Sequence, residues 1–208
     1  MEILKDVNSI AILGGTFNPI HNAHIMMAET VYNTFHPEKV IIMPNYQTYY
    51  KQGASAVDVN YRIDMIDLAI SDYPYMESSD LELRRGGITY TIDTIKELRD
   101  IYPDKKIYFI IGGDSLAWLD KWVKADELFK LTTFIAFSRH DISYDKAVLE
   151  KERILALYPY ADIIVMEEQI PDISSSYIRE AIKSGDSVEG MLPESLIEYI
   201  VSNSLYKD

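Results

Sequence analysis

The sequence predicts an α/β fold of Rossmann-like type: a doubly wound parallel sheet with helices on both faces, in a single domain over residues 1–208. Short β-branched runs alternate with helical patterns along the chain, an order that is typical of parallel sheets. Two of the runs, "SIAILGG" and "KIYFIIGG", end in a glycine pair. The chain has 208 residues, 48% of them hydrophobic, and shows no internal repeat or long Gly/Ser linker. One continuous core is therefore expected.

Apolar runs and helical spacing place the individual elements. The expected strands are Ser9–Gly15, Lys39–Pro44, Lys106–Gly113, Thr133–Arg139 and Asp162–Glu167. The expected helices run from about Asn22 to Phe35, Asn60 to Asp72, Thr91 to Pro103, Tyr144 to Leu157, Ser175 to Ser184 and Pro193 to Ser202. Residues 45–58 are expected to form a long loop, and Thr91 is expected to cap its helix. In such a sheet a ligand binds beyond the carboxyl ends of the strands, where "GGTFNPIHNAH" and "IGGDS" stand.

Composition limits the classes of partner. The absence of cysteine excludes disulfides, thiolate metal sites and a cysteine nucleophile, and it is typical of a reducing, cytoplasmic compartment. The N-terminal apolar run is too short for a signal peptide, and no stretch approaches the roughly 20 apolar residues of a membrane span. The formal net charge of −13 argues against nucleic acid. A small phosphorylated substrate remains compatible if the cations gather in one cleft.

The stretch Gly14–His24, "GGTFNPIHNAH", has the features of a phosphate site. Its glycines let the backbone approach a ligand and adopt dihedrals that other residues avoid. A helix opens near Asn22, and its unpaired N–H groups and dipole favour an anion. His21 lies three residues before His24, so both project on one side of the helix start and offer donors to phosphate oxygens.

Other interpretations of this stretch remain open at this point. A histidine at a helix start is usually a cap or a surface residue. An H-x-x-H pair can bind a metal, but no carboxylate or third ligand stands nearby. The stretch does not have the G-x-G-x-x-G spacing of a dinucleotide fingerprint.

A second candidate site lies near the other end of the chain, in "DISSSYIREAI" (Asp172–Ile182). Three serines ahead of an amphipathic helix are natural N-caps, and capping alone would explain them. The same hydroxyls and amides could hold triphosphate oxygens, with Arg179 supplying a fixed charge one turn inside.

The first stretch resembles the G-G-T-F-[DN]-P-[IV]-H-x-[GA]-H signature of the nucleotidyltransferase superfamily. The second is similar to its I-S-S-T-x-I-R motif, with Ser176 where threonine is usual. Three further segments resemble the bacterial nicotinate-mononucleotide adenylyltransferases: "RRGGITYTIDTIKEL", "FIIGGDSLAWLDKW" and "LPESLIEYIVSNSLY". The resemblance extends nearly from end to end.

The resemblance implies roles for individual residues. The catalytic residues would be His21, His24 and Arg179. ATP would be bound by Gly14, Gly15, Thr16, Phe17, Gly112, Asp114, Ser174, Ser175 and Ser176. The mononucleotide would be bound by Lys51, Thr89, Tyr90, Thr91, Trp122 and Arg139. Taken alone, Asp114 could be a helix cap, and Trp122 would more often be a core residue than a platform for the pyridine ring.

Two segments depart from the family pattern. Where P-P-H-K is usual, this chain has "TYYK", so Tyr50 replaces the histidine while Lys51 remains. Where R-P-G is usual, Arg139 is followed by His140 and Asp141. The role of the turn beside Arg139 is therefore open.

The implied reaction joins ATP and nicotinate mononucleotide to give nicotinate adenine dinucleotide and pyrophosphate. The attacking group is already an anionic phosphate, so no general base is assigned. Mg²⁺ is expected to be held mainly by the ATP phosphates. Two alternatives stay open: another phosphate-ester nucleotidyltransferase, and a nucleotide-binding regulatory domain without turnover. The sequence leaves the oligomeric state open, a homo-oligomer included.

Overall fold

The computed structural model describes residues 8–48, 56–138 and 142–207. Its centre is a six-stranded sheet of order β4-β2-β1-β6-β7-β8, in which each neighbouring pair is parallel. These strands are β1 (Ser9–Gly15), β2 (Val40–Pro44), β4 (Met76–Ser78), β6 (Lys106–Gly112), β7 (Thr133–Phe137) and β8 (Ile163–Met166). A second, two-stranded parallel sheet pairs β3 (Gln47–Thr48) with β5 (Ile88–Thr89). The predicted parallel sheet is confirmed.

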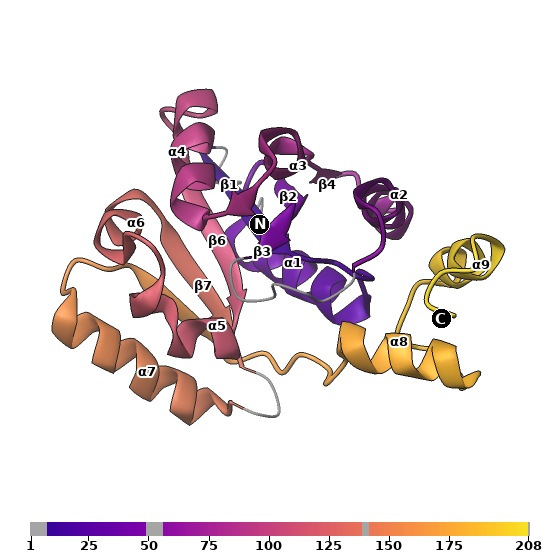
Figure 1. The fold of residues 1–208 in the computed structure, drawn as a ribbon. Coiled ribbons are helices and arrows are strands. Elements are labelled where there is room, and N and C mark those ends of the chain that lie inside the picture. Colours follow the sequence, from indigo (N-terminus) through magenta and orange to yellow (C-terminus); the bar gives the residue numbers. More distant parts are fainter. Residues whose placement is uncertain (1–7, 49–55, 139–141, 208) are drawn as a thin grey trace, which may run out of the picture.

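Helices cover both faces of the large sheet (Figure 1). On one face lie α1 (Asn22–Phe35), α2 (Val59–Ile70), α8 (Ser175–Ser184) and α9 (Glu194–Ser202). On the other lie α3 (Leu81–Arg85), α4 (Thr91–Ile101), α5 (Gly113–Ala117), the 3-10 turn η1 (Leu119–Lys121), α6 (Ala125–Leu131) and α7 (Tyr144–Leu157). The doubly wound arrangement is therefore confirmed.

The central strand shows why two layers of helices are needed. Successive side chains of a strand point to opposite faces, so a strand that is apolar throughout must be covered on both. In β1, Ala11 and Leu13 pack into the core beneath α1 and α2. Ile10 and Ile12 pack into the other core, beneath α4 and α7. All four side chains are 3% exposed or less.

Most predicted elements have the predicted bounds to within two residues. Three boundaries need correction. Gly113 belongs to α5 and not to the preceding strand. The expected loop after Pro44 contains β3. Thr91 is the first helical residue of α4, and Tyr90 stands at the N-cap position without a side-chain capping bond. The expected capping by Thr91 is therefore wrong, because the backbone turns helical one residue earlier than the pattern indicated.

The strand order places the expected ligand site. The chain runs from β1 outward to β2 and β4, then returns to the other side of β1 with β6. The crevice at such a reversal, outside the carboxyl ends of the strands, is where open α/β sheets bind ligands. Within residues 8–48, 56–138 and 142–207, none of the helices has the length and apolar character of a membrane span.

Candidate active site

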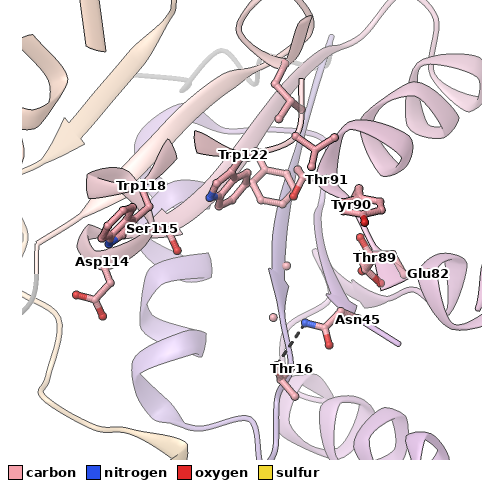
Figure 2. Close-up of a pocket in the computed structure, with 15 residues that line it drawn as sticks. Thr16, Asn45, Glu82, Thr89, Tyr90, Thr91, Asp114, Ser115, Trp118 and Trp122 are labelled. Carbon is pink, nitrogen blue, oxygen red and sulfur yellow. Dashed lines mark hydrogen bonds between the residues drawn. The ribbon is translucent and has the colours of Figure 1, made fainter. Parts of the chain in front are cut away.

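A cavity of about 660 Å³ opens at the carboxyl ends of β1, β2 and β6. Eight of the predicted site residues line it: Gly14, Gly15, Thr16, Thr89, Tyr90, Thr91, Asp114 and Trp122. Seven residues that were not predicted also line it: Asn45, Glu82, Phe109, Ser115, Trp118, Val123 and Leu128. Figure 2 shows Asp114, Ser115 and Trp118 on one side of Trp122 and the Thr89–Thr91 segment on the other.

The glycine pair is required by close packing. A Cβ on Gly14 would lie 3.1 Å from the Phe109 ring, and one on Gly15 would lie 2.9 Å from the Phe17 ring. Neither glycine has a positive φ, so the expectation of unusual dihedrals is wrong for this pair. Within the stretch Gly14–His24, the residue with a left-handed backbone is Phe17, at φ 47°. Its side chain is 2% exposed and packs in the core, so only its backbone can take the predicted part in ATP binding.

The two histidines form one compact unit at the start of α1. His21 is the N-cap residue and is 1% exposed. Its backbone N–H donates to Nδ1 of His24 at 3.3 Å, and the two rings stack at a centroid distance of 3.6 Å. Because Nδ1 of His24 accepts this bond, the neutral His24 ring carries its proton on Nε2. The histidines therefore cap the helix, as the simpler interpretation held, and His24 presents a donor at Nε2.

The serine motif lies directly against the glycine motif, although the two are far apart in sequence. Ser175 Oγ donates to the carbonyl of Pro19 at 2.9 Å, across 156 residues. Arg179 Nη1 donates to the carbonyl of Asn18 at 2.8 Å, and Nη2 donates to Ser176 Oγ at 3.3 Å. The helix N-cap is Ser174, whose Oγ accepts from the Tyr177 N–H. The capping interpretation thus holds for one serine of the three.

The end of the chain adds further contacts to the same loop. The Asn22 N–H donates to the carbonyl of Met191, and its side-chain amide donates to the carbonyl of Gly190, both at 2.9 Å. Tyr206 Oη donates to Asn18 Oδ1 at 2.8 Å. The loop after β1 is thus held from α8, from the 188–192 turn and from the segment after α9.

A buried arginine that the sequence did not point to joins the first two strands. Arg62 of α2 is 1% exposed, and its Nη1 donates to the carbonyls of Thr16 and Asn45, each at 2.8 Å. Burial lowers the pKa of this guanidinium. Asn45 in turn donates to Thr16 Oγ1 at 3.4 Å (Figure 2). Arg62 therefore fixes the ends of β1 and β2 relative to each other and puts a cation behind the cavity wall.

Behind the Thr89–Thr91 segment lies a buried carboxyl group, Glu82 of α3, which is 5% exposed. Thr94 Oγ1 donates to Glu82 Oε1 at 2.5 Å and accepts from Arg85 Nη2 at 2.8 Å. Arg85 also pairs with Glu97 at 3.0 Å. Burial raises the pKa of Glu82 to about 7, against the opposing effects of the Thr94 hydroxyl and the Arg85 charge.

Replacing Glu82 by glutamine is expected to change how stability depends on pH. Because the folded protein binds this proton more tightly than the unfolded chain does, the free energy of unfolding falls as pH rises from about 4.5 through 7. The full effect is on the order of 3 kcal/mol. Glu82→Gln removes this component, so urea unfolding at pH 5 and pH 8 should give a smaller difference for the variant. The exposed Glu152→Gln is the control, and a Glu82→Gln curve parallel to that of the unmodified protein would contradict the assignment.

The opposite wall of the cavity begins where β6 ends. Gly112 is the N-cap residue of α5, and Asp114 is exposed in its first turn. Trp122 is half-buried and meets Phe109 and Phe134 edge-on, at 6.3 and 6.1 Å. It is therefore both a core residue and a wall of the cavity. Trp118, which the sequence did not point to, also lines this cavity and is 66% exposed.

Some predicted residues lie away from the cavity or outside the described structure. His21, His24, Arg179 and the three serines do not line it, and they gather around the loop that follows Gly15. Lys51, Arg139 and the departures at Tyr50, His140 and Asp141 lie outside the described residues. Among the described residues, no group of three His, Cys, Asp or Glu side chains could hold a metal ion.

The fold and this site define a doubly wound α/β domain with a cavity at the carboxyl ends of its central strands. A family model described as cytidylyltransferase-like matches residues 12–181. A probable nicotinate-nucleotide adenylyltransferase from Lachnoclostridium phytofermentans is 38% identical over 200 residues, which cover 96% of this chain and all of that protein. Another with the same description, from Dehalococcoides mccartyi, is 38% identical over 94% of this chain and 95% of its own. The chain therefore belongs to the cytidylyltransferase-like family, among its nicotinate-nucleotide adenylyltransferases.

Solved structures agree on the fold. The nicotinic acid mononucleotide adenylyltransferase of Plasmodium falciparum, complexed with NaAD, superimposes with a TM-score of 0.79 at 22% identity. The match covers 96% of this chain and 97% of that one. The same protein complexed with APC gives a TM-score of 0.75. The family resemblance stated from the motifs is confirmed.

Proposed function

We propose that this chain, as a single domain over residues 1–208, transfers the adenylyl group of ATP to nicotinate mononucleotide, a reaction of NAD biosynthesis. The observation that carries the proposal is the meeting of the two motifs. Ser175 and Arg179 bind the carbonyls of the loop that follows Gly15, next to a cavity large enough for a nucleotide. The relatives from Lachnoclostridium phytofermentans and Dehalococcoides mccartyi are both named as probable nicotinate-nucleotide adenylyltransferases.

The chemistry needs alignment and charge stabilisation. A phosphate oxygen of the mononucleotide attacks the α-phosphorus of ATP, the bond from that phosphorus to the β-bridging oxygen breaks, and pyrophosphate leaves. No proton has to move, because the attacking oxygen is already anionic. His24 and His21 donate to the α-phosphate, while Arg179 and the serine hydroxyls hold the departing β- and γ-phosphates. Lys51 and Arg139 stay proposed phosphate contacts of the mononucleotide.

The residues around the loop are donors that match phosphate oxygens: histidine, arginine, serine hydroxyl and backbone N–H. This donor set suits Mg²⁺ held through the ATP phosphates and water more than a metal bound by protein ligands. When bound, Mg²⁺ neutralises charge on the phosphates. Arg62 adds a permanent cation behind the same wall. Arg62 and Arg179 thus place two positive charges beside the loop, which supports the binding of anionic substrates by a chain of net charge −13.

The cavity supplies the two groups that a pyridine carboxylate needs. Trp122 offers a stacking face, and the start of α4 at Tyr90 and Thr91 offers N–H groups and the positive end of a helix dipole. Stacking does not distinguish an acid from an amide, whereas backbone donors do. The substrate is therefore the acid, with Gly112 and Asp114 left to the ribose of ATP.

The test is a panel of acceptors assayed for pyrophosphate release with ATP or CTP and Mg²⁺. We expect turnover with ATP, and a specificity constant for nicotinate mononucleotide more than about tenfold above that for the amide. Each charge-assisted hydrogen bond contributes roughly 1.5–3 kcal/mol. Equal constants for acid and amide would contradict the pocket but leave adenylyl transfer intact. Preference for CTP or pantetheine phosphate would favour another nucleotidyltransferase, and absence of turnover would favour a regulatory domain.

A further inference from the structure

The two tryptophans of the chain stand in one short segment that a buried carboxylate ties to a different helix. Trp118 and Trp122 flank the 3-10 turn η1, and both line the cavity (Figure 2). Asp120 lies two residues from each of them. The segment is made of a five-residue helix followed by a three-residue turn. Elements this short do not hold their own geometry, so contacts from outside must do it.

Those contacts come from α7. The Asp120 side chain is 2% exposed and faces the Arg153 guanidinium in a two-point arrangement. Arg153 Nη2 donates to Oδ1 at 2.8 Å, and Nη1 donates to Oδ2 at 3.1 Å. Lys121 Nζ lies 2.9 Å from Oδ2. The hydrogen bond from Arg153 holds the pKa of Asp120 far below its usual range, so the carboxylate is ionised at neutral pH.

Arg153 is itself held in place. Its Nε donates to Glu150 Oε2 at 2.7 Å, one turn earlier on α7. Its Nη2 also reaches the carbonyl of Ala117 at 3.4 Å. One guanidinium thus contacts the segment just before Trp118 and again between the two tryptophans. A planar fork fixes both position and rotation, which a single point contact does not.

We propose that Asp120 and Arg153 are positioning residues for the pyridine ring of the mononucleotide, because they set the distance and tilt of Trp118 and Trp122 in the cavity wall. The proposal rests on the proposed function for the identity of the ring. Neither residue lines the cavity, so the pair acts through the tryptophans. A pair that only stabilised the docking of α7 would change the melting temperature and leave substrate preference alone.

The experiment compares Asp120→Asn and Arg153→Gln with the unmodified enzyme. We expect the KM for nicotinate mononucleotide to rise about fivefold to tenfold, the effect of losing most of one aromatic contact. The KM for ATP and kcat should stay within about twofold. Because the residues act together, the double variant should be no worse than the poorer single one. Arg153→Lys, which keeps the charge but loses the fork, is the milder variant if Asp120→Asn does not fold.

Tryptophan fluorescence gives a readout independent of turnover, since both tryptophans report on this segment. In the ligand-free variants we expect red-shifted emission and stronger quenching by acrylamide. The control is Asp162→Asn, whose carboxylate pairs with Lys106 at the amino-terminal ends of β6 and β8, away from the cavity. It should change neither the emission nor the KM values.

Three outcomes would overturn the proposal: an unchanged KM for the mononucleotide, an equal rise in both KM values, or unchanged emission in the variants. If the unmodified protein does not use nicotinate mononucleotide, the proposed function fails. The fluorescence of the variants then still decides whether the pair positions the tryptophans.

Discussion

Replacing His24 by alanine is expected to lower kcat for adenylyl transfer about 10²- to 10³-fold, the effect of removing one preorganised donor to transition-state charge. In the structure, Nδ1 of His24 accepts from the His21 N–H, so the neutral ring carries its proton on Nε2, the proposed donor to phosphate. Steady-state pyrophosphate release measures the loss, and circular dichroism checks the fold. His21→Ala should act similarly, and the double variant should be less than additive because both act on one charge.

The capping role of His24 has to be separated from its catalytic role, because losing a cap costs about 1 kcal/mol by itself. His24→Gln keeps an acceptor for the His21 N–H at the third helical position, as in a capping box, but has no imidazole. We expect it to restore stability and not activity. His36→Asn, at the left-handed C-cap of the same helix, is the control and should leave kcat unchanged. Near-normal turnover of His24→Ala would mean that this histidine is only a cap.

Replacing Arg179 by lysine is expected to raise the KM for ATP about tenfold to hundredfold, with little change in the KM for the mononucleotide. One guanidinium reaches both the Asn18 carbonyl and Ser176 Oγ. A lysine ammonium on a flexible stem cannot hold that fork and a phosphate together. The expected size is that of one hydrogen bond to a charged group, roughly 1.5–3 kcal/mol. Initial-rate kinetics with each substrate varied in turn measures it.

A matched control for Arg179 lies on the same helix. Lys183 stands in the last turn of α8, and Lys183→Gln removes a charge without touching the loop. It should leave both KM values unaltered. Equal weakening toward both substrates in Arg179→Lys would contradict a role in holding ATP and would indicate a defect in the packing of α8 and α9.

How far the sequence predicts the fold depends on element length. The bounds of β1, α1, α7 and α8 match their predictions at both ends, because each has enough residues to show its hydrophobic period. The missed elements are short: the strands β3, β4 and β5 have two or three residues, α3 and α5 have five each, η1 has three and α6 has seven. Their conformations depend on contacts with distant segments, which no local pattern records.

The site divides in the same way. The motif residues around Gly14 and Ser175 could be predicted from their residue types. Glycine, histidine, serine and arginine after a buried strand or at the start of a helix are typical of phosphate sites. Arg62 could not. In a helical pattern an arginine is expected on the solvent side. This one is buried because its guanidinium donates to the carbonyls of Thr16 and Asn45, which belong to distant loops. The family motif points to Trp122 and not to Trp118. Both tryptophans line the cavity because of the 3-10 turn between them, which the sequence did not predict.

The contacts that the C-terminal part of the chain makes with the loop after β1 have a consequence for synthesis. Asn18 and Pro19 are made early, yet their partners include Ser175, Arg179 and Tyr206. At a synthesis rate of about 5–20 residues per second, these partners are made roughly ten to forty seconds after the loop. A nascent chain can pair its first strands in that time but has no finished place for a triphosphate. On the proposed binding of the triphosphate at this loop, ATP stabilises only molecules whose last helices have docked, and the substrate itself favours completed chains over partial ones.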